Sequence, residues 1–385
     1  MQRETALATA LCRTPLTAAA DERIRTLLGG PVDWKVIETL ASRWQIEPLV
    51  FRNLVLHYRG AMPEPVAIAF ESRARDTRAH ALTRTLVLLD LVKKMESAGI
   101  PALVLKGPTV AIAAYGDVSL RTFADVDLLL HPQDLVAARK LMIDLGYRNE
   151  YSLDIEAGLI RGQHALEFAD GRNKVELHWS LLSRHLRFDL GPQRMWDESK
   201  KVPCLDSEIP TLDRARLFLF MCAHGAKHEW ALFRWVCDTA QLAARLDAAE
   251  ATEVLRLAQQ HHTRRLLSIA VRLAGKTFGE EYSGFPPNAL VPPSDTRELV
   301  AFASKGLLPG KDPSPPATGA LRRLHPYIAP LTFWIRSRER MRDRIACVAQ
   351  VLFLPNASEA TRSPIVWLLR PLRLAASAFR RAAPA

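Results

Sequence analysis

The sequence has no long uninterrupted hydrophobic run among its 385 residues. Its most apolar stretches, such as residues 348–354, are short and soon meet proline or charge, whereas a bilayer-spanning helix needs about 20 apolar residues. We therefore predict no transmembrane segment. The first sixteen residues, MQRETALATALCRTPL, also lack the cleavage site of a secretory signal, so we expect them to form a helix.

Cysteine is scarce, and its distribution excludes two classes of small stabilised domain. The five cysteines are an odd number, they are widely separated, and no C-x-x-C pair occurs. This pattern argues against a disulfide framework and against a zinc ribbon, and it is typical of a reducing compartment. We expect buried free thiols and a cytoplasmic protein.

Acidic residues are fewer than basic ones, with 41 Asp and Glu against 52 Lys and Arg, and the formal net charge is +11. Such an excess favours anionic partners, such as nucleotides, nucleic acid or a phospholipid surface. Much of it is arginine spread along predicted helices, and solvated helix faces explain it equally well. Nucleic acid is therefore compatible with the charge, but no motif indicates it.

The apolar pattern divides the chain into three regions. Residues 1–98 carry apolar side chains at three-to-four spacing and are predicted to be helical. Residues 99–205 contain short strand-like runs, and residues 206–385 are again predicted to be mainly helical. Proline-rich loops at 283–294 and 309–316 interrupt the last region. The expected class is α+β, with a small mixed sheet flanked by an N-terminal helical arm and a C-terminal helical domain.

The central region predicts a compact α/β unit. Residues 100–105 (IPALVL) are typical of a strand, and the following KGP breaks it before a short helix at 109–114. A second strand is predicted at 126–130. Residues 165–168 and 174–179 flank a D-G-R-N turn and predict a β-hairpin.

Three acidic residues in this unit carry the predicted chemistry. Asp125 and Asp127 stand at positions i and i+2 at the start of an apolar strand, so both side chains should face the same side, with Cα atoms about 6.6 Å apart. Glu176 is flanked by apolar residues on another predicted strand. If the two strands are neighbours, about 4.8 Å apart, three carboxylates converge on one site.

A cluster of three carboxylates favours a divalent cation, because mutual repulsion raises the cost of ionisation unless a cation neutralises it. Hard oxygen ligands suit Mg²⁺ or Mn²⁺. An isolated D-x-D is common and more often caps a turn than holds metal. Here, however, a strand, a Lys-Gly turn and a helix precede it, and a third acid follows on a strand.

These residues resemble the nucleotidyltransferase superfamily that includes DNA polymerase beta and the minimal nucleotidyltransferases. Its pattern is a glycine turn that opens a helix, then an acidic pair, then a later acid on a neighbouring strand, which Gly107, Asp125 with Asp127, and Glu176 match. More closely, the segments LVLKGPTVAIAAYGDVSLRTFADVDLLL, VELHWSLL and CAHGAKHEWALFRWVCDTAQL are similar to a bacterial family of uncharacterised nucleotidyltransferases. The likeness covers residues 82–246 well.

The resemblance implies roles for these residues. Asp125, Asp127 and Glu176 would hold the metal ions, Glu176 would also help to deprotonate the acceptor, and Gly107 would offer backbone N–H groups to a phosphate. The usual Gly-Ser of the superfamily is Gly-Pro here, which removes a hydroxyl and one N–H donor. Lys106 and Arg121 are candidates to supply the positive charge at the phosphates, although surface positions beside a turn explain both equally well.

Three histidines are candidates for substrate contacts. His178 lies two residues after Glu176 and should share its strand face, within reach of nucleotide or acceptor. His224 and His228 are spaced i, i+4 on a predicted helix, a spacing that can hold metal. Because no H-E-x-x-H motif accompanies them, packing or a contact with the acceptor is the favoured interpretation.

The sequence thus predicts a metal-dependent nucleotidyltransferase. It would move a nucleoside monophosphate from an NTP such as ATP to an unidentified acceptor, whether peptide, saccharide or small molecule, and release pyrophosphate. Two alternatives stay open, namely a phosphoryl transferase, and a non-catalytic binding or scaffold protein that keeps the fold and holds a partner with its basic helices.

Overall fold

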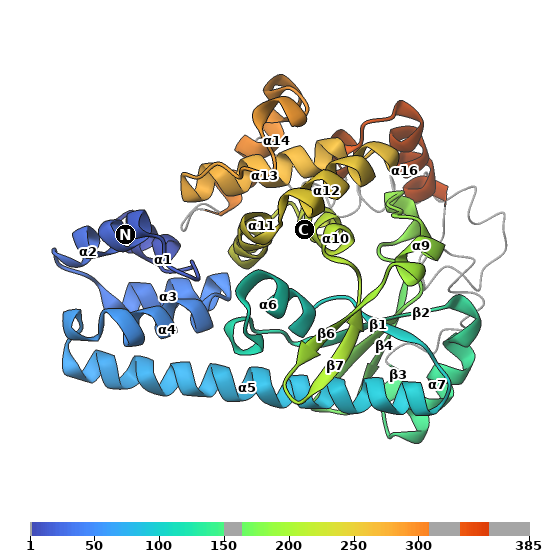
Figure 1. Cartoon of the computed structure of the whole chain (residues 1–385), viewed down its shortest axis with the longest axis horizontal. Helices are drawn as coiled ribbons and strands as arrows, with labels where there is room; N and C mark the ends of the chain where they lie inside the picture. Colours follow the sequence, from blue (N-terminus) through green and yellow to red (C-terminus); the bar gives the residue numbers. More distant parts are fainter. Residues whose placement is uncertain (1, 150–163, 308–331, 354–385) are drawn as a thin grey trace, which may run out of the picture.

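A seven-stranded mixed sheet lies in the middle of the computed structural model, with helices from both ends of the chain around it (Figure 1). The structure describes residues 2–149, 164–307 and 332–353. The predicted α+β class, a mixed sheet with helices before and after it, is confirmed. Within the described ranges no helix is both long and apolar enough to cross a membrane.

Five helices precede the sheet. They are α1 (Gln2–Ala10), α2 (Ala18–Leu28), α3 (Trp34–Trp44), α4 (Glu47–His57) and α5 (Glu64–Ser97). Asp33 caps α3 by accepting hydrogen bonds from the backbone N–H groups of Lys35 and Val36, as its position before an apolar run indicates. The 34 residues of α5 extend for about 51 Å at 1.5 Å per residue. This helix runs beneath the other N-terminal helices and then beneath the sheet (Figure 1).

The strand order in the sheet is β3-β4-β5-β2-β1-β7-β6. The strands are β1 (Ala102–Val104), β2 (Asp125–Leu130), β3 (Arg148–Asn149), β4 (Ala165–Ala169), β5 (Lys174–His178), β6 (Lys200–Cys204) and β7 (Ser207–Thr211). In the centre, β2 pairs antiparallel with β1 on one side and parallel with β5 on the other. The two strands predicted to carry the acids are therefore direct neighbours.

The predicted hairpin is confirmed by β4 and β5, which pair antiparallel. Its turn is fixed by Asp170, whose Oδ1 accepts hydrogen bonds of 2.8 and 2.6 Å from the backbone N–H groups of Arg172 and Asn173. This is an Asx-type turn, which the sequence D-G-R-N favours.

A second hairpin, β6 and β7, was not predicted. Each of its strands contains a proline, at positions 203 and 210, which weakens the strand signal and is tolerated near a sheet edge. It joins the sheet through Val104 of β1, whose carbonyl accepts a 2.7 Å hydrogen bond from the hydroxyl of Thr211. The predicted boundary between residues 205 and 206 thus falls in the turn of this hairpin, and the sheet extends to Thr211.

The two faces of β2 have different environments, as strand alternation requires. Val126, Leu128 and Leu130 pack into a core that also contains residues of α5 and of α7 (Leu135–Asp144). On the opposite face, Leu129 belongs to the larger core that includes α6 (Pro108–Tyr115) and the C-terminal helices. Asp125 and Asp127 share this second face, so their carboxylates point toward the C-terminal helices.

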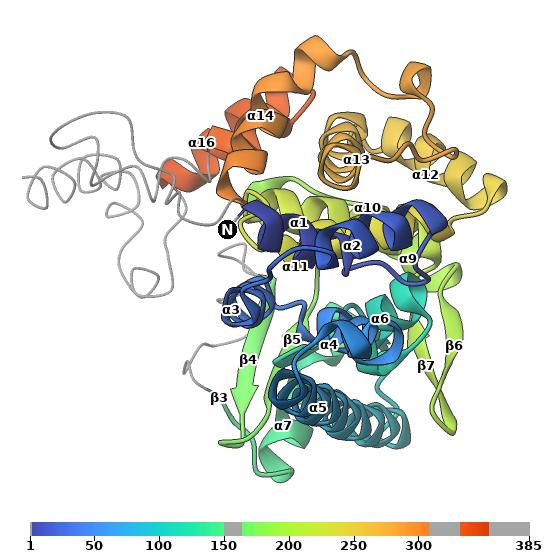
Figure 2. The ribbon, with the colours of Figure 1, turned by 90° about the vertical axis from the view of Figure 1, so that its left-hand side faces the viewer.

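The described chain after the sheet is mainly helical, as predicted for residues 206–385 apart from β7. Besides a short α9 (Pro192–Asp197), its helices are α10 (Arg214–Lys227), α11 (Phe233–Arg245), α12 (Ala248–Gln260), α13 (Arg264–Phe278), α14 (Pro293–Gly306) and α16 (Met341–Phe353). Figure 2 shows α1 to α4 layered between α5 and α13. The proline-rich loop at 283–294 leads from α13 into α14, whereas the one predicted at 309–316 lies outside the described residues. All five cysteines are buried and free.

Candidate active site

Parallel pairing of β2 with β5 brings two acidic side chains together at the centre of the sheet. Asp127 lies opposite Glu176 in the register, and both face the C-terminal helices. Asp127 is 2% exposed, while the side chain of Glu176 retains 18% exposure. One carboxylate is therefore enclosed and the other stays open to a ligand.

His178 connects the two acids. Its Nε2 lies 3.0 Å from Oδ1 of Asp127 and 3.2 Å from Oε2 of Glu176. The ligand atoms of these three residues lie within 4.8 Å of one another, which makes them a group able to hold a metal ion. The ring is buried, and in the described structure its Nδ1 has no hydrogen-bond partner. The prediction that His178 shares the face of Glu176 is confirmed.

Lys106 supplies the nearest positive charge. Its Nζ lies 2.8 Å from Oδ1 of Asp127 and its side chain is 14% exposed. The residue sits between β1 and α6, and the adjacent backbone is held to β2 by a 3.0 Å hydrogen bond from the N–H of Leu105 to the carbonyl of Asp127. Lys106 thus faces the carboxylates from the turn that was predicted to bind phosphate.

The electrostatics of the cluster follow from burial and from these contacts. Burial favours the neutral form of Asp127, but the charge of Lys106 and the hydrogen bond from His178 outweigh it and hold the pKa of Asp127 far below its usual range. The pKa of Glu176 is also lowered, because its hydrogen bond with His178 overcomes burial. Burial opposes the charged form of His178, yet its hydrogen bonds to both acids raise its pKa. The contacts of Lys106 and His178 therefore favour the charged forms of both acids.

Asp125 lies beside this group and is not part of it. It shares the strand face two residues earlier and is partly exposed, but the group whose ligand atoms lie close enough to hold a cation consists of Asp127, Glu176 and His178. Burial and the negative charge of Asp127 raise the pKa of Asp125. Asp125, predicted to hold metal together with Asp127, thus stands at the edge of this group, where an added cation would stabilise its charged form. A role for Asp125 as a metal ligand stays a prediction.

Gly107 has a conformation that side-chain-bearing residues avoid. It precedes α6 with φ of 65° and ψ of −119°, in the part of the map that glycine occupies at low cost. A Cβ here would lie 3.2 Å from the ring of Phe123. The backbone conformation therefore favours glycine, and the ring of Phe123 leaves little room for a Cβ. Pro108 follows at the first helical position, and the hydroxyl of Thr109 donates to the carbonyl of Lys106 at 3.2 Å.

Arg121 was predicted to contact phosphate, and the structure places it in a buried ion pair. Its Nε lies 3.0 Å from Oδ2 of Asp238 on α11, and it is 4% exposed. The hydroxyl of Tyr115 donates to Oδ1 of the same aspartate at 2.8 Å. This network ties α6 and the segment before β2 to α11. A contact between Arg121 and a phosphate stays a prediction.

His224 and His228 lie together near the end of α10. Their rings are 5.0 Å apart, and both contact the indole of Trp235, at 5.3 and 4.9 Å. Burial lowers the pKa of His224 well below its ordinary value, and the charge of Lys106 lowers it further. Neither histidine belongs to the described metal-binding group. The two imidazoles and the indole of Trp235 form an aromatic cluster, and their lowered pKa values favour neutral imidazoles. A contact between these histidines and the acceptor stays a prediction.

Lys227 faces the same site and was missed in the sequence. Burial and the charge of Lys106 lower its pKa, whereas Glu176 and Asp127 act in the opposite direction, so all three groups are close enough to influence it. It follows His224 by three residues, on the last turn of α10. That i, i+3 spacing was the available signal. Lys227 adds a second ammonium to the surroundings of the carboxylates, from the end of α10.

Comparison with known families finds a match over the region that contains these residues. The profile of a family described as uncharacterised nucleotidyltransferase matches residues 30–279, which include β1 to β7 and all the site residues above. No curated protein matches the chain. The match covers about two thirds of the sequence and contains the glycine turn, the acidic pair and the later glutamate in order. The chain belongs to this family of uncharacterised nucleotidyltransferases.

Proposed function

We propose that the protein is a metal-dependent enzyme that transfers a nucleoside monophosphate from an NTP to an acceptor and releases pyrophosphate. The observation that carries the proposal is the direct pairing of Asp127 with Glu176 on neighbouring strands, beside a glycine turn that opens α6. Family membership supports the same class of reaction. The triphosphate would lie beside Lys106, Asp127 and Glu176, which are already in contact with one another or with His178.

The donor set fits a divalent cation. The ligand atoms of Asp127, Glu176 and His178 lie within 4.8 Å of one another, and Asp125 adds a carboxylate on the same face. Carboxylate oxygens suit Mg²⁺ or Mn²⁺, whereas an imidazole is a more usual ligand of transition metals than of Mg²⁺. When bound at Asp127 and Glu176, the ion would neutralise charge on the triphosphate and on the displaced pyrophosphate.

The chain's own residues would position the reacting groups. The first-turn N–H groups of α6 lack intrahelical acceptors and suit a phosphate, and Lys227 can approach the same anion from α10. The acceptor oxygen would form a bond to the α-phosphorus while the bond to the β-phosphate oxygen breaks. Glu176, the more exposed carboxylate, would take the acceptor's proton, and its hydrogen bond to His178 fixes its orientation.

A second candidate is a non-catalytic binding protein that retains the fold. Lys106 and His178 both contact Oδ1 of Asp127, so the ammonium of Lys106 already balances the charge of this carboxylate. Such a protein would bind its partner without a divalent ion. Salt-sensitive partner binding that is indifferent to EDTA would favour it.

Nucleotide binding with and without metal tests the proposed function. We expect a fluorescent ATP analogue to bind the purified protein with Mg²⁺ or Mn²⁺ and to be released by EDTA, because the triphosphate needs the ion to approach two carboxylates. GTP, CTP and UTP as competitors would define the base. Equal binding by the wild type and by an Asp125→Asn/Asp127→Asn double variant would contradict the proposal.

Replacing Lys227 with glutamine should weaken metal-dependent NTP binding by about 10-fold, the size expected from loss of one charge-assisted hydrogen bond. The residue is a helix-end lysine, so we expect little change in thermal stability. Lys35→Gln is the matched control, since Lys35 is an exposed lysine on α3. If Lys227→Gln and Lys35→Gln bind NTP with equal affinity in the presence of metal, Lys227 does not contact the nucleotide.

A further inference from the structure

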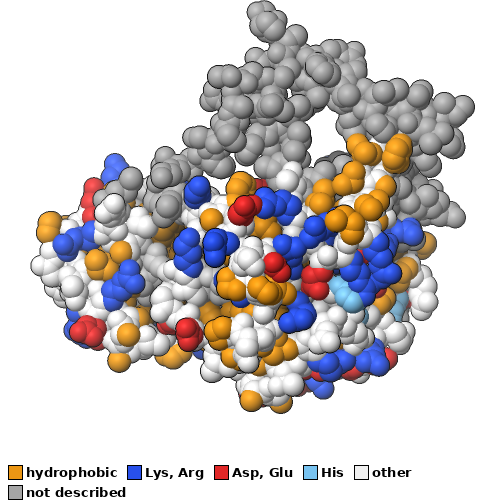
Figure 3. All heavy atoms as spheres, turned by 90° about the horizontal axis from the view of Figure 1, so that it is seen from above, with side chains coloured by type: hydrophobic (Ala, Val, Ile, Leu, Met, Phe, Trp, Pro, Cys, Tyr) orange, Lys and Arg blue, Asp and Glu red, His pale blue; other side chains and the backbone are white. Residues whose placement is uncertain are grey.

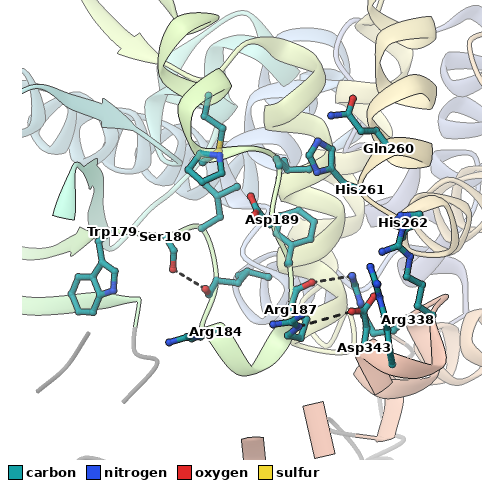
Figure 4. A pocket seen from close by; sticks show the side chains of 18 residues that line it. Trp179, Ser180, Arg184, Arg187, Asp189, Gln260, His261, His262, Arg338 and Asp343 are labelled. Atoms are coloured by element: carbon teal, nitrogen blue, oxygen red, sulfur yellow. Dashed lines mark hydrogen bonds and ion pairs between the residues drawn. The ribbon is translucent and has the colours of Figure 1, made fainter. Parts of the chain in front are cut away.

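A cavity of about 610 Å³ lies beyond the end of β5, outside the group formed by Asp127, Glu176 and His178. Its walls are the segment 179–190, the residues at the end of α12, and residues 338–343 at the start of α16 (Figure 4). The volume is in the range of small-molecule sites. Ser180 lines it and lies two residues after His178, so their Cα atoms are at most about 7 Å apart. The cavity therefore begins beside the catalytic strand.

The lining of this cavity is strongly basic. Five arginines face two aspartates, which leaves three positive charges in excess before any histidine is counted. The charged residues are Arg184, Arg187, Arg338, Arg340, Arg342, Asp189 and Asp343. Seen from the side of the C-terminal helices, Lys and Arg side chains are spread over this face, and several of them lie beside histidine at one end of it (Figure 3). We call this cavity the arginine pocket.

Arg338 is the most buried charged side chain in the lining of the arginine pocket, and its position is fixed by protein contacts. It is 2% exposed, and its Nη2 donates to the carbonyl of Arg187 at 3.0 Å. Its guanidinium lies 5.8 Å from the ring of Trp334. Among the described residues, its Nε and Nη1 have no hydrogen-bond partner. A buried guanidinium is costly unless its donors are paired, so these two N–H groups point to an anionic ligand.

The wall that carries Arg338 is fixed in place. The indole N–H of Trp334 donates to the carbonyl of Leu186 at 2.9 Å, and the hydroxyl of Ser337 donates to the carbonyl of Trp334 at 2.6 Å. Asp343 is already engaged, with its Oδ1 3.9 Å from Nε of Arg187. These contacts hold the segment after β5 against the start of α16, so the pocket is preformed.

We propose that the arginine pocket binds the anionic part of the acceptor, a phosphate or carboxylate group, and that the acceptor is a small anionic molecule. This inference rests on the proposed nucleotidyl transfer. Arg338 contacts the anion, while Arg184 and Arg340 add charge around it. The acceptor hydroxyl or second oxyanion then extends past Ser180 toward Glu176. A neutral saccharide or a peptide amine leaves Arg338 unpaired.

Calorimetry on the full-length protein tests the pocket with glycerol 3-phosphate and succinate as probes and glycerol as the uncharged match. We expect at least one of the two anions to bind and glycerol not to bind. Arg338→Gln should weaken binding at least about 10-fold, from the loss of a charged donor. An Arg184→Gln/Arg340→Gln double variant, whose side chains are less buried, provides the same test if Arg338→Gln folds poorly. Arg336→Gln is the control, because Arg336 is exposed and does not line the pocket.

A second set of measurements distinguishes anion binding in the arginine pocket from NTP binding at the carboxylates. Anion binding should persist in EDTA and in Asp127→Asn, and the double variant should bind the ATP analogue as the wild type does. The inference is overturned if neither anion binds, if Arg336→Gln weakens binding as much as the pocket variants, or if the double variant loses NTP affinity in parallel. Failure of metal-dependent NTP binding alone would count against the proposed function and leave the anion measurement intact.

Discussion

Asp127→Asn is expected to reduce the affinity of the nucleotide-loaded protein for Mn²⁺ by at least about 100-fold, since loss of a direct ligand should exceed the 10- to 100-fold effects of outer-shell partners. Asp127 is the most enclosed acid of the site, and it contacts both Lys106 and His178. Asparagine keeps the shape of the side chain but removes the negative charge. The free Mn²⁺ signal in electron paramagnetic resonance measures the affinity directly and needs no knowledge of the acceptor.

Without an acceptor, the enzyme should slowly transfer the nucleotide to water and release pyrophosphate. Asp127→Asn should lower the rate of this release by on the order of 1000-fold. Asp144→Asn is the matched control. Asp144 is an exposed aspartate that pairs with Lys140, and both residues belong to α7, which packs on the other face of the sheet. A circular dichroism melt distinguishes loss of function from loss of fold. Unchanged Mn²⁺ affinity in a folded Asp127→Asn protein would show that the metal binds elsewhere.

Local pattern was sufficient to predict the elements that carry the acids. Two carboxylates at i and i+2 before an apolar run predict a strand with both acids on one face, and β2 has this form. Glu176 between Val175 and Leu177 predicts the same alternation in β5. Strand alternation is a short-range property, so the sequence determines it directly. The neighbour relation between β2 and β5 was an assumption, and the register Asp127↔Glu176 makes it a finding.

Contacts between distant segments were not predictable in the same way. Arg121 stands four residues before Asp125 in the sequence, yet it turns to Asp238 on α11 because that buried carboxylate needs a cation. Lys227 comes near Glu176 and Asp127 only because the end of α10 lies over this face of the sheet. The arginine pocket joins Arg338 to residues after β5, about 150 positions earlier. The spacing of residues along the sequence does not show which distant segment such a side chain will contact.

Asp238→Ala is expected to lower the free energy of unfolding by about 3–5 kcal/mol, the cost of breaking a buried ion pair from one side. Asp238 is fully buried and accepts hydrogen bonds from Tyr115 and Arg121. Without it, the guanidinium of Arg121 stays in the core with no counter-charge. Urea denaturation followed by tryptophan fluorescence measures the difference. Asp144→Ala, which breaks an exposed pair, should cost no more than about 1 kcal/mol.

A double variant, Arg121→Met/Asp238→Leu, separates the charge effect from packing. If the unpaired guanidinium of Arg121 causes the loss of stability in Asp238→Ala, the double variant, with apolar side chains of similar volume, should recover most of the free energy of unfolding. If Asp238→Ala proves no more costly than Asp144→Ala, then the network does not anchor α11 to the segment before β2. Because this anchor lies between α6 and the strand that carries Asp127, we also expect Asp238→Ala to weaken metal-dependent NTP binding in the fraction that remains folded.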